Sequence, residues 1–186
     1  MELKVDQLSK SYRGVPVLTD LSFTAHVGIT RVTGASGIGK TTLLRILLGL
    51  EAPDGGTISG NALRWAAVFQ EDRLLPALSA RANLRFALGS DYNASRADAL
   101  LAELGLGAVD DKPVSEWSGG MKRRLALARA LLARADANAL DEPFTGLDTE
   151  NRVRAERCLL RAAEEKIVLL VSHEGDTLGE CEELRL

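Results

Sequence analysis

Two hydrophobic patterns alternate along this chain. Up to residue 33, apolar and polar positions alternate in "LKVDQLS", "VLTDLSFTAHV" and "ITRVT", with a turn at "RGVP". This period of two residues predicts short strands joined by turns. Strand character returns in "TIS" and "RWAAVF", after the turn "APDGG", and later in "ANAL" and "KIVLLVS". The last of these runs is apolar and rich in β-branched residues, which is typical of a buried parallel strand.

Helical periodicity fills the intervals between these strands. The segment "TTLLRILLGL" predicts an apolar helix that ends near Gly49. We expect Ser79 to cap the helix "ARANLRFAL", which stops at Gly89. Ser95, with Asp98, predicts a capping box for the helix "RADALLAEL". Further helices are expected over residues 119–134 and about 150–165.

The order of these elements predicts an α/β fold interrupted by a block of helices. Strands and helices alternate at both ends of the chain, and helices alone follow from about residue 74. We therefore predict one domain over residues 1–186, with a core formed by residues 1–73 and 136–186. A helical subdomain is expected over residues 74–135.

Composition agrees with an ordinary soluble globular protein. The 186 residues include 46% hydrophobic and 26% charged positions, which excludes disordered and fibrous classes. The net charge of -3 gives no general attraction to nucleic acid. The one basic cluster, formed by Lys122, Arg123 and Arg124, is interpreted as a solvated helix face.

Cysteine usage and hydropathy favour a reducing compartment. Cys158 and Cys181 have no metal-ligand spacing, so we expect structural thiols. The longest aliphatic runs, such as "IVLLV", are far shorter than the roughly 20 residues of a membrane-spanning helix. No signal peptide is recognised at the N-terminus. We therefore expect a soluble, cytoplasmic chain.

A phosphate-binding loop is the most specific motif in the sequence. The segment "GASGIGKTT" fits the pattern G-x-x-x-x-G-K-[ST] and lies between a predicted strand and a predicted helix, as the motif requires. Glycines let the backbone wrap around phosphate oxygens, a lysine reaches the β and γ phosphates, and a threonine hydroxyl ligates Mg²⁺. The nucleotide-binding residues expected here are Gly34, Ala35, Ser36, Gly37, Gly39, Lys40, Thr41 and Thr42.

Acidic residues follow a later predicted strand. In "ANALDEPFTGLD", the strand ends in Asp141, which we expect to hold Mg²⁺ through water, while Glu142 polarises the attacking water. His173 follows the strand "IVLLVS". The next strand of a parallel sheet would place His173 at the same carboxyl edge as the phosphate loop, where it could hydrogen-bond the γ-phosphate.

A second anion site is indicated in "SEWSGGMKRRLALARALL". The residues Ser118, Gly119 and Gly120 open a predicted helix, and small residues leave the backbone N–H groups of a helix start accessible. One small chain would then carry two phosphate sites.

Five segments together carry a family resemblance. "GASGIGKTT", "VFQEDRLLP", "WSGGMKRRLALARALL", "LDEPFTGLD" and "VSHE", in this order, resemble the ATP-binding cassette (ABC) ATPases, specifically the nucleotide-binding subunit of a transporter. The resemblance spans nearly the whole chain. It implies a P-loop core with a parallel sheet, an N-terminal antiparallel β-subdomain and an inserted helical subdomain. The segment "VFQEDRLLPALSARANL" most resembles importer ATPases for nitrate, sulfonate or taurine-like solutes.

The resemblance also implies roles for single residues. Tyr12 would stack on adenine, and Gln70 would contact Mg²⁺ and sense a membrane partner. Glu142 would be the catalytic base and His173 the γ-phosphate contact, while Asp148 would communicate across a dimer interface.

The same resemblance implies partners. Ser118, Gly119 and Gly120 would face the ATP of a second copy in a head-to-tail dimer, which accounts for two anion sites in one chain. ATP and Mg²⁺ would be bound. The partners would be a second ABC ATPase subunit, an integral membrane permease and a solute-binding protein, with the chain at the cytoplasmic face of the membrane.

Two features of the sequence do not follow the expected pattern: the ends of the signature, and polar residues in strands that are predicted to be central. The usual signature reads Leu-Ser-Gly-Gly-Gln, whereas this chain has Trp117 and Met121 at the two ends. Arg31 and Asn138 lie in strands predicted to be central, where polar side chains require partners.

Three other functions share part of this motif pattern. A soluble cassette ATPase of DNA repair or translation usually carries two cassettes or a long coiled-coil insertion, and this sequence shows neither. A P-loop kinase of a small metabolite would not need the Ser-Gly-Gly signature. A degenerate module that binds ATP without hydrolysis is kept open by Met121, although Lys40, Asp141, Glu142 and His173 are intact.

Overall fold

The computed structural model describes residues 1–59, 63–107, 112–172, 178–179 and 181–186. The chain forms two compact units. Unit 1 comprises Met1–Trp65, Ala135–Asp141 and Ala163–Leu186, and unit 2 comprises Ala66–Arg134 and Glu142–Ala162. The division into subdomains at residues 73 and 135 stays a prediction.

Unit 1 begins with an antiparallel sheet. Its strands are β1 (Glu2–Tyr12), β2 (Val15–His26) and β4 (Gly55–Ser59), in the order β2-β1-β4. The predicted turn at "RGVP" is confirmed, because Arg13 and Gly14 between β1 and β2 have positive φ angles of 51° and 80°. The antiparallel N-terminal region is therefore present as expected.

The second sheet of unit 1 is parallel. Strands β6 (Ala137–Asp141), β7 (Ile167–Val171), β3 (Gly28–Thr33) and β8 (Glu182–Arg185) are neighbours in that order. Val171 pairs with Val32 on one side and with Asp141 on the other. The carboxyl ends of β3, β7 and β6 thus meet at one edge of the sheet, as predicted. Strand β8 was not predicted, because the strand β3 with which it pairs is distant in sequence.

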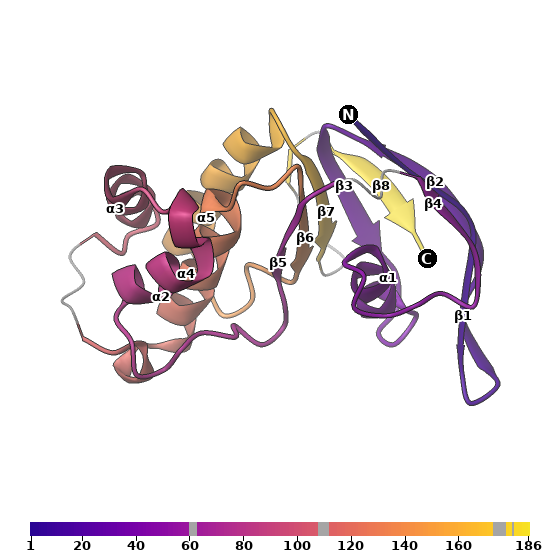
Figure 1. Ribbon diagram of the computed structural model, residues 1–186, viewed down its shortest axis with the longest axis horizontal. Helices are drawn as coiled ribbons and strands as arrows, with labels where there is room; N and C mark the ends of the chain where they lie inside the picture. The colour runs from indigo at the N-terminus through magenta and orange to yellow at the C-terminus, as the bar shows by residue number, and fades with distance from the viewer. Residues whose placement is uncertain (60–62, 108–111, 173–177, 180) are drawn as a thin grey trace. The chain divides into compact units, whose positions relative to one another are not determined.

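Helix α1 (Lys40–Leu47) completes the core of unit 1 (Figure 1). Its residues Leu43, Leu44, Ile46 and Leu47 are buried, and they belong to one hydrophobic cluster that also includes residues of β1, β2, β6 and β7. A helix buried by both sheets must be apolar around much of its surface, which explains the run "LLRILL". The predicted helix end near Gly49 is confirmed, because Gly49 has a φ of 68°.

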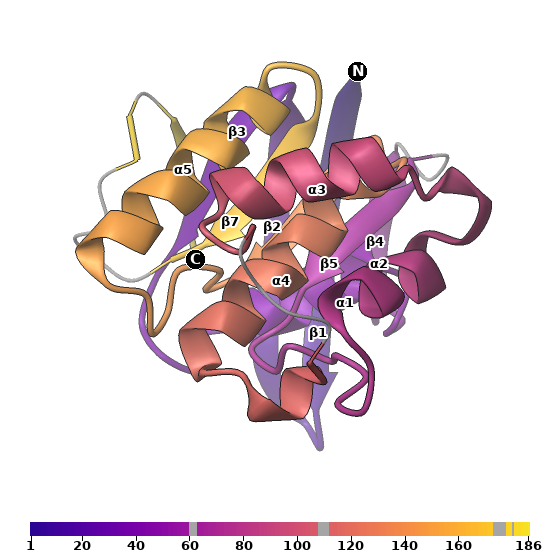
Figure 2. The same ribbon diagram turned by 90° about the vertical axis from the view of Figure 1, so that its left-hand side faces the viewer.

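Unit 2 is mainly helical. Strand β5 (Trp65–Val68) leads into it, and the helices that follow are α2 (Ala80–Leu88), η1 (Gly89–Asp91), α3 (Ala94–Glu103), η2 (Val114–Glu116), α4 (Gly119–Leu132) and α5 (Thr149–Ala163). Figure 2 shows α2 and α3 beside α4, with which both make contacts. Helix α4 is the centre of this bundle, because most of its residues are buried.

One predicted helix cap is confirmed and another is wrong. The Ser79 hydroxyl accepts the Ala82 N–H at the start of α2, as predicted. At α3, however, Asn93 is the cap and accepts the Arg96 N–H at 2.9 Å, while Ser95 lies inside the helix. An Asn two residues earlier satisfies the first turn and lengthens the helix, so the capping box at Ser95 does not form.

The structure corrects the interpretation of the basic cluster after the signature. Arg123 and Arg124 are only 5% and 7% exposed, so they are not part of a solvated helix face. Burying a guanidinium is unfavourable unless its N–H groups find acceptors. Carbonyl, amide and carboxylate oxygens around Arg123 and Arg124 accept these hydrogen bonds. Every helix in the described part of the chain falls short of the length and apolar character that crossing a bilayer requires.

Candidate functional site

The phosphate loop of unit 1 is shaped by glycines. It runs from Gly34, at the end of β3, to Gly39, which precedes α1. Gly34, Gly37 and Gly39 have φ angles of 142°, 79° and 122°, a region that other residues rarely adopt. A Cβ on Gly39 would lie 2.9 Å from the side chains of Val17 and Leu18. Glycine is therefore required here both by the backbone conformation and by the space available.

The start of α1 presents backbone N–H groups to this loop. Gly39, the N-cap residue, supplies no side chain to cap the first turn. The Lys40 ammonium lies over the loop, where it donates to the carbonyls of Gly34 (2.6 Å) and Ala35 (2.9 Å). A lysine ammonium and the uncapped start of a helix thus lie at one glycine-rich loop. This arrangement suits the phosphates of a nucleotide.

Thr41 and Asp141 meet at the same edge of the parallel sheet. The Thr41 hydroxyl donates to the Asp141 carboxylate, and the two oxygens lie 2.8 Å apart. Asp141 ends β6 and is only 2% exposed. A hydroxyl and a carboxylate next to a phosphate loop are the hard oxygen donors that Mg²⁺ prefers. The two residues therefore fit a magnesium site.

Glu142 follows directly in the chain and belongs to unit 2. Its backbone has a φ of 51°, which is uncommon for a residue with a side chain. The carboxylate accepts the Thr145 hydroxyl at 3.3 Å, and the backbone carbonyl accepts the Thr145 N–H at 3.2 Å. The side chain is half-buried, so its carboxylate stays accessible to water.

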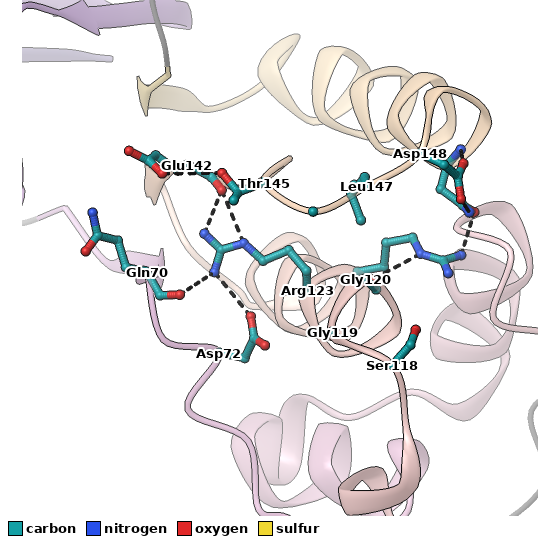
Figure 3. Close-up of a pocket in the computed structure, with 13 residues that line it drawn as sticks. Gln70, Asp72, Ser118, Gly119, Gly120, Arg123, Glu142, Thr145, Leu147 and Asp148 are labelled. Carbon is teal, nitrogen blue, oxygen red and sulfur yellow. Dashed lines mark hydrogen bonds and ion pairs between the residues drawn. The ribbon is translucent and has the colours of Figure 1, made fainter.

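A pocket in unit 2 brings together several residues that the sequence had singled out (Figure 3). Its lining includes Gln70, Ser118, Gly119, Gly120, Glu142 and Asp148. Gly120 has to be small, because a Cβ there would lie 3.2 Å from the Gly146 carbonyl oxygen. The loop after Glu142 thus packs closely on the start of α4.

The signature helix begins at Gly119, as predicted, and the structure shows Ser118 as its N-cap. The Ser118 hydroxyl accepts the Met121 N–H at 3.3 Å, so one of the free donors of the first turn is satisfied within the chain. Ser118 and Gly119 are exposed. Met121 contributes this backbone donor whatever its side chain, and Trp117 is 6% exposed and anchors the preceding turn.

Asp148 caps the next helix. It accepts the Asn151 backbone N–H at 2.9 Å and the Asn151 side-chain amide at 2.7 Å. These donors hold the pKa of the Asp148 carboxyl below its ordinary value. Arg124 donates in turn to the Asn151 side-chain oxygen at 2.7 Å and to the Leu104 carbonyl at 2.6 Å. Helices α3, α4 and α5 are tied together by this network.

Other predicted residues are placed individually. Tyr12 ends β1 with a partly exposed ring, and the Lys10 ammonium lies 5.6 Å from the ring centre. Gln70 is exposed. His173 lies outside the described residues. The roles predicted for these residues stay predictions.

The two polar residues of the parallel sheet differ. Arg31 meets Glu183 of β8 at 3.4 Å, which supplies the partner that the sequence could not identify. The Thr33 hydroxyl and Arg31 hold the pKa of the Glu183 carboxyl below its usual value. The Asn138 amide, fully buried in β6, has no hydrogen-bond partner among the described residues.

Sequence reasoning missed the arginines of α4 as site residues. Arg123 and Arg124 both line the pocket, together with Thr145 and Asn151. A signal was available: the two arginines precede "LALARALL", and such a run predicts a helix buried almost all round, which leaves no solvated face for them. Cys158 is confirmed as a structural thiol, and burial raises its pKa to about 11.

Comparisons with known proteins identify the family of the chain. The family model of the ABC transporter matches residues 18–145. An aliphatic sulfonates import ATP-binding protein from Rhodococcus jostii is 43% identical over 173 residues, covering 88% of this chain and 69% of that protein. A second protein of this name, from Pseudomonas savastanoi, is 37% identical and covers 95% of this chain and 75% of its own length.

A solved structure supports the same relationship. A provisionally assigned ABC transporter ATP-binding protein from Pyrococcus furiosus superposes with a TM-score of 0.87 at 26% identity, covering 100% of this chain and 98% of that chain. The α/β P-loop fold inferred from the sequence is thereby confirmed. The chain therefore belongs to the ABC transporter family and is one of its ATP-binding subunits, an ATPase.

Proposed function

We propose that the chain hydrolyses ATP for an importer and works as a head-to-tail homodimer closed over two ATP molecules. The observation that carries this proposal is a pair of distinct helix starts. One is a phosphate loop with a lysine, a threonine and an acidic partner in unit 1, and the other is the exposed Ser118-Gly119 start of α4 in unit 2. In a head-to-tail pair, the loop of one copy and the α4 start of the other would hold each ATP.

Each residue has a defined task in this proposal. Lys40 and the loop N–H groups bind the β and γ phosphates. Thr41 and Asp141 would hold Mg²⁺, and the family pattern makes Gln70 a further oxygen ligand. When bound, Mg²⁺ neutralises charge on the phosphate oxygens. Glu142 accepts a proton from the attacking water as general base.

Further roles follow from the family pattern. Tyr12 stacks on the adenine ring, since its face is partly exposed and an aromatic ring suits a nucleobase. His173 contacts the γ-phosphate. Asp148, which is exposed beside the α4 start, communicates with the second copy.

The transport partner is a membrane permease, together with a solute-binding protein. Relatives named as aliphatic sulfonates import ATP-binding proteins support import and a solute of the sulfonate class. Leu75, which precedes α2, and Phe86, which lies within it, are 36% and 73% exposed and offer apolar surface for the permease. The chain would then work at the cytoplasmic face of the membrane. Co-purification with an untagged permease, lost in Phe86→Asp but kept in Arg85→Gln, tests this contact.

The test of the shared site is Glu142→Gln with ATP and Mg²⁺, with mass measured by light scattering. The variant binds ATP without cleaving it, so we expect an ATP-dependent dimer with twice the mass of one chain and loss of steady-state turnover. Glu165→Gln, which changes an exposed carboxylate outside the site, is the matched control and keeps wild-type turnover. A Glu142→Gln chain that stays monomeric at saturating ATP and high protein concentration contradicts the shared site. Wild-type turnover in that variant contradicts the base assignment.

A further inference from the structure

Arg123 is the most deeply buried charged group at the pocket of unit 2. It lies in the second turn of α4 and is 5% exposed, less than its neighbour Arg124. A buried guanidinium requires acceptors for its donors, since an unpaired charge in the interior is unfavourable. The groups that accept these hydrogen bonds are therefore the groups that Arg123 holds in place.

The guanidinium donates to two chain segments at once, Glu142 and the stretch from Phe69 to Asp72 (Figure 3). Its Nε and Nη2 atoms both donate to the Glu142 backbone carbonyl, at 3.2 and 2.6 Å. Its Nη1 atom donates to the carbonyls of Phe69 and Gln70 and to the Asp72 carboxylate, the last two at 3.3 and 3.2 Å. One side chain of the signature helix thus joins the backbone of Glu142 to the backbone at Gln70.

The contact with Glu142 fixes an uncommon backbone conformation. Glu142 has a φ of 51°, and a residue with a side chain stays in this region only when its surroundings hold it there. Its carbonyl receives a two-pronged contact from Arg123 and a third hydrogen bond from the Thr145 N–H. Because the carbonyl plane is held, the direction in which the Cα–Cβ bond of Glu142 leaves the backbone is restrained as well.

We propose that Arg123 is a positioning residue for Glu142. It holds the Glu142 peptide in the conformation that aims the carboxylate, and it couples this peptide to the segment of Gln70 through α4. The proposal rests on the proposed role of Glu142 as general base. A lysine could not replace the arginine, because a point charge cannot span carbonyls on two sides as a planar fork does.

Arg129 provides a matched control on the same helix. From the end of α4 it donates to the carbonyls of Asp72 and Arg73, at 2.9 and 2.6 Å. Within the described residues it has no hydrogen bond to Glu142. It therefore holds the same loop as Arg123 without touching the peptide of the base. A difference between the two arginines isolates the contact with Glu142.

The experiment measures kcat and KM for ATP in Arg123→Lys and Arg129→Gln. We expect Arg123→Lys to lower kcat about 100-fold, the loss typical of a misplaced catalytic group, with KM changed less than about threefold. Arg129→Gln keeps kcat within about threefold of the wild type. In the Glu142→Gln background, measured with radiolabelled ATP, Arg123→Lys causes no further loss, because it acts through Glu142. Equal loss in both backgrounds, or a kcat near the wild-type value in Arg123→Lys, overturns the proposal.

Amide hydrogen exchange without nucleotide provides a readout independent of catalysis. The Thr145 amide donates to the Glu142 carbonyl, so it exchanges faster in Arg123→Lys than in Arg129→Gln, while amides of α5 are unchanged. Unchanged exchange at Thr145 overturns the proposal. Circular dichroism verifies that each variant is folded, and Arg123→Gln serves if the lysine variant unfolds. If Glu142→Gln keeps wild-type turnover while Thr145 exchange responds to Arg123→Lys, the base assignment fails but the positioning contact stands.

Discussion

The starts of α1 and α4 are both suited to anions, yet they are built differently. At α1, three glycines with positive φ open the loop, no side chain caps the first turn, and Lys40 lies over the loop. At α4, Ser118 caps the first turn itself, and the nearby guanidiniums of Arg123 and Arg124 donate to groups inside unit 2. The first start brings its own cation, whereas the second offers N–H groups and a hydroxyl.

The presence or absence of a cation indicates which helix start can hold a nucleotide without a second copy of the chain. Binding a triphosphate requires charge neutralisation, and at α1 the Lys40 ammonium and a Mg²⁺ ion held by Thr41 and Asp141 would supply it. The cations nearest to the α4 start are engaged within unit 2, because Lys122 donates to the Ser115 carbonyl and the two arginines donate to the groups named above. We infer that this start adds to a site whose charge is balanced elsewhere. Such an incomplete site fits a contact with the ATP of a second copy.

The largest expected effect is the loss of either the dimer or nucleotide binding, depending on which helix start is substituted. Ser118→Arg places a bulky side chain on the exposed α4 start, so it abolishes the ATP-dependent dimer of Glu142→Gln while the single chain still binds nucleotide. Lys40→Ala abolishes nucleotide binding itself. Light scattering and equilibrium binding of a fluorescent ATP analogue distinguish the two. Loss of single-chain binding in Ser118→Arg would refute the assignment of Ser118 to the partner's ATP.

A smaller effect concerns the buried polar side chains near the two sites, one in strand β6 and one in helix α4. Strand β6, which carries Asp141, contains the Asn138 amide, which has no hydrogen-bond partner in the described part of the chain, whereas the buried Arg124 of α4 donates to Leu104 and Asn151. Asn138→Leu removes a buried amide without a partner, so we expect the free energy of unfolding to rise by about 1–3 kcal/mol. Urea unfolding followed by circular dichroism measures it. Asn138→Asp, which buries a charge, serves as the opposite control, and a less stable leucine variant would disprove the account.

The smallest expected effect is a pH dependence of unit 1. Arg64 donates two side-chain bonds and its backbone N–H to Asp136, just before β6, and holds the pKa of that carboxyl at about 2. Because this pKa is lowered on folding, the stabilisation is present above about pH 4 and is lost as the pH falls towards 2. We expect Arg64→Gln to melt below the wild type at pH 7, with the difference shrinking between pH 4 and 2. Arg134→Gln, an exposed arginine near β6, shows no such trend. A constant difference for Arg64→Gln would contradict the prediction.

Much of the fold could be predicted because the patterns are local. The phosphate loop, the cap at Ser79, the helix start at Ser118, Gly119 and Gly120, and the strand before Asp141 each depend on residues close in sequence. The cap of α3 was wrong because Asn93 and Ser95 are both good caps and only the folded helix selects one. Strand β8 was missed because its pairing with β3 joins residues about 150 positions apart.

The sequence by itself determined the family, the fold class and the phosphate loop of this protein. Glycine conformations, hydrophobic periods and a lysine next to a threonine are fixed by short stretches of chain. Only the tertiary structure decided that Arg123 and Arg124 are buried rather than solvated, that Arg31 pairs with Glu183, and that the peptide of Glu142 is held from α4. The physical reason is that a charged side chain is buried only where distant segments bring acceptors to it, and no local pattern records which segments will meet.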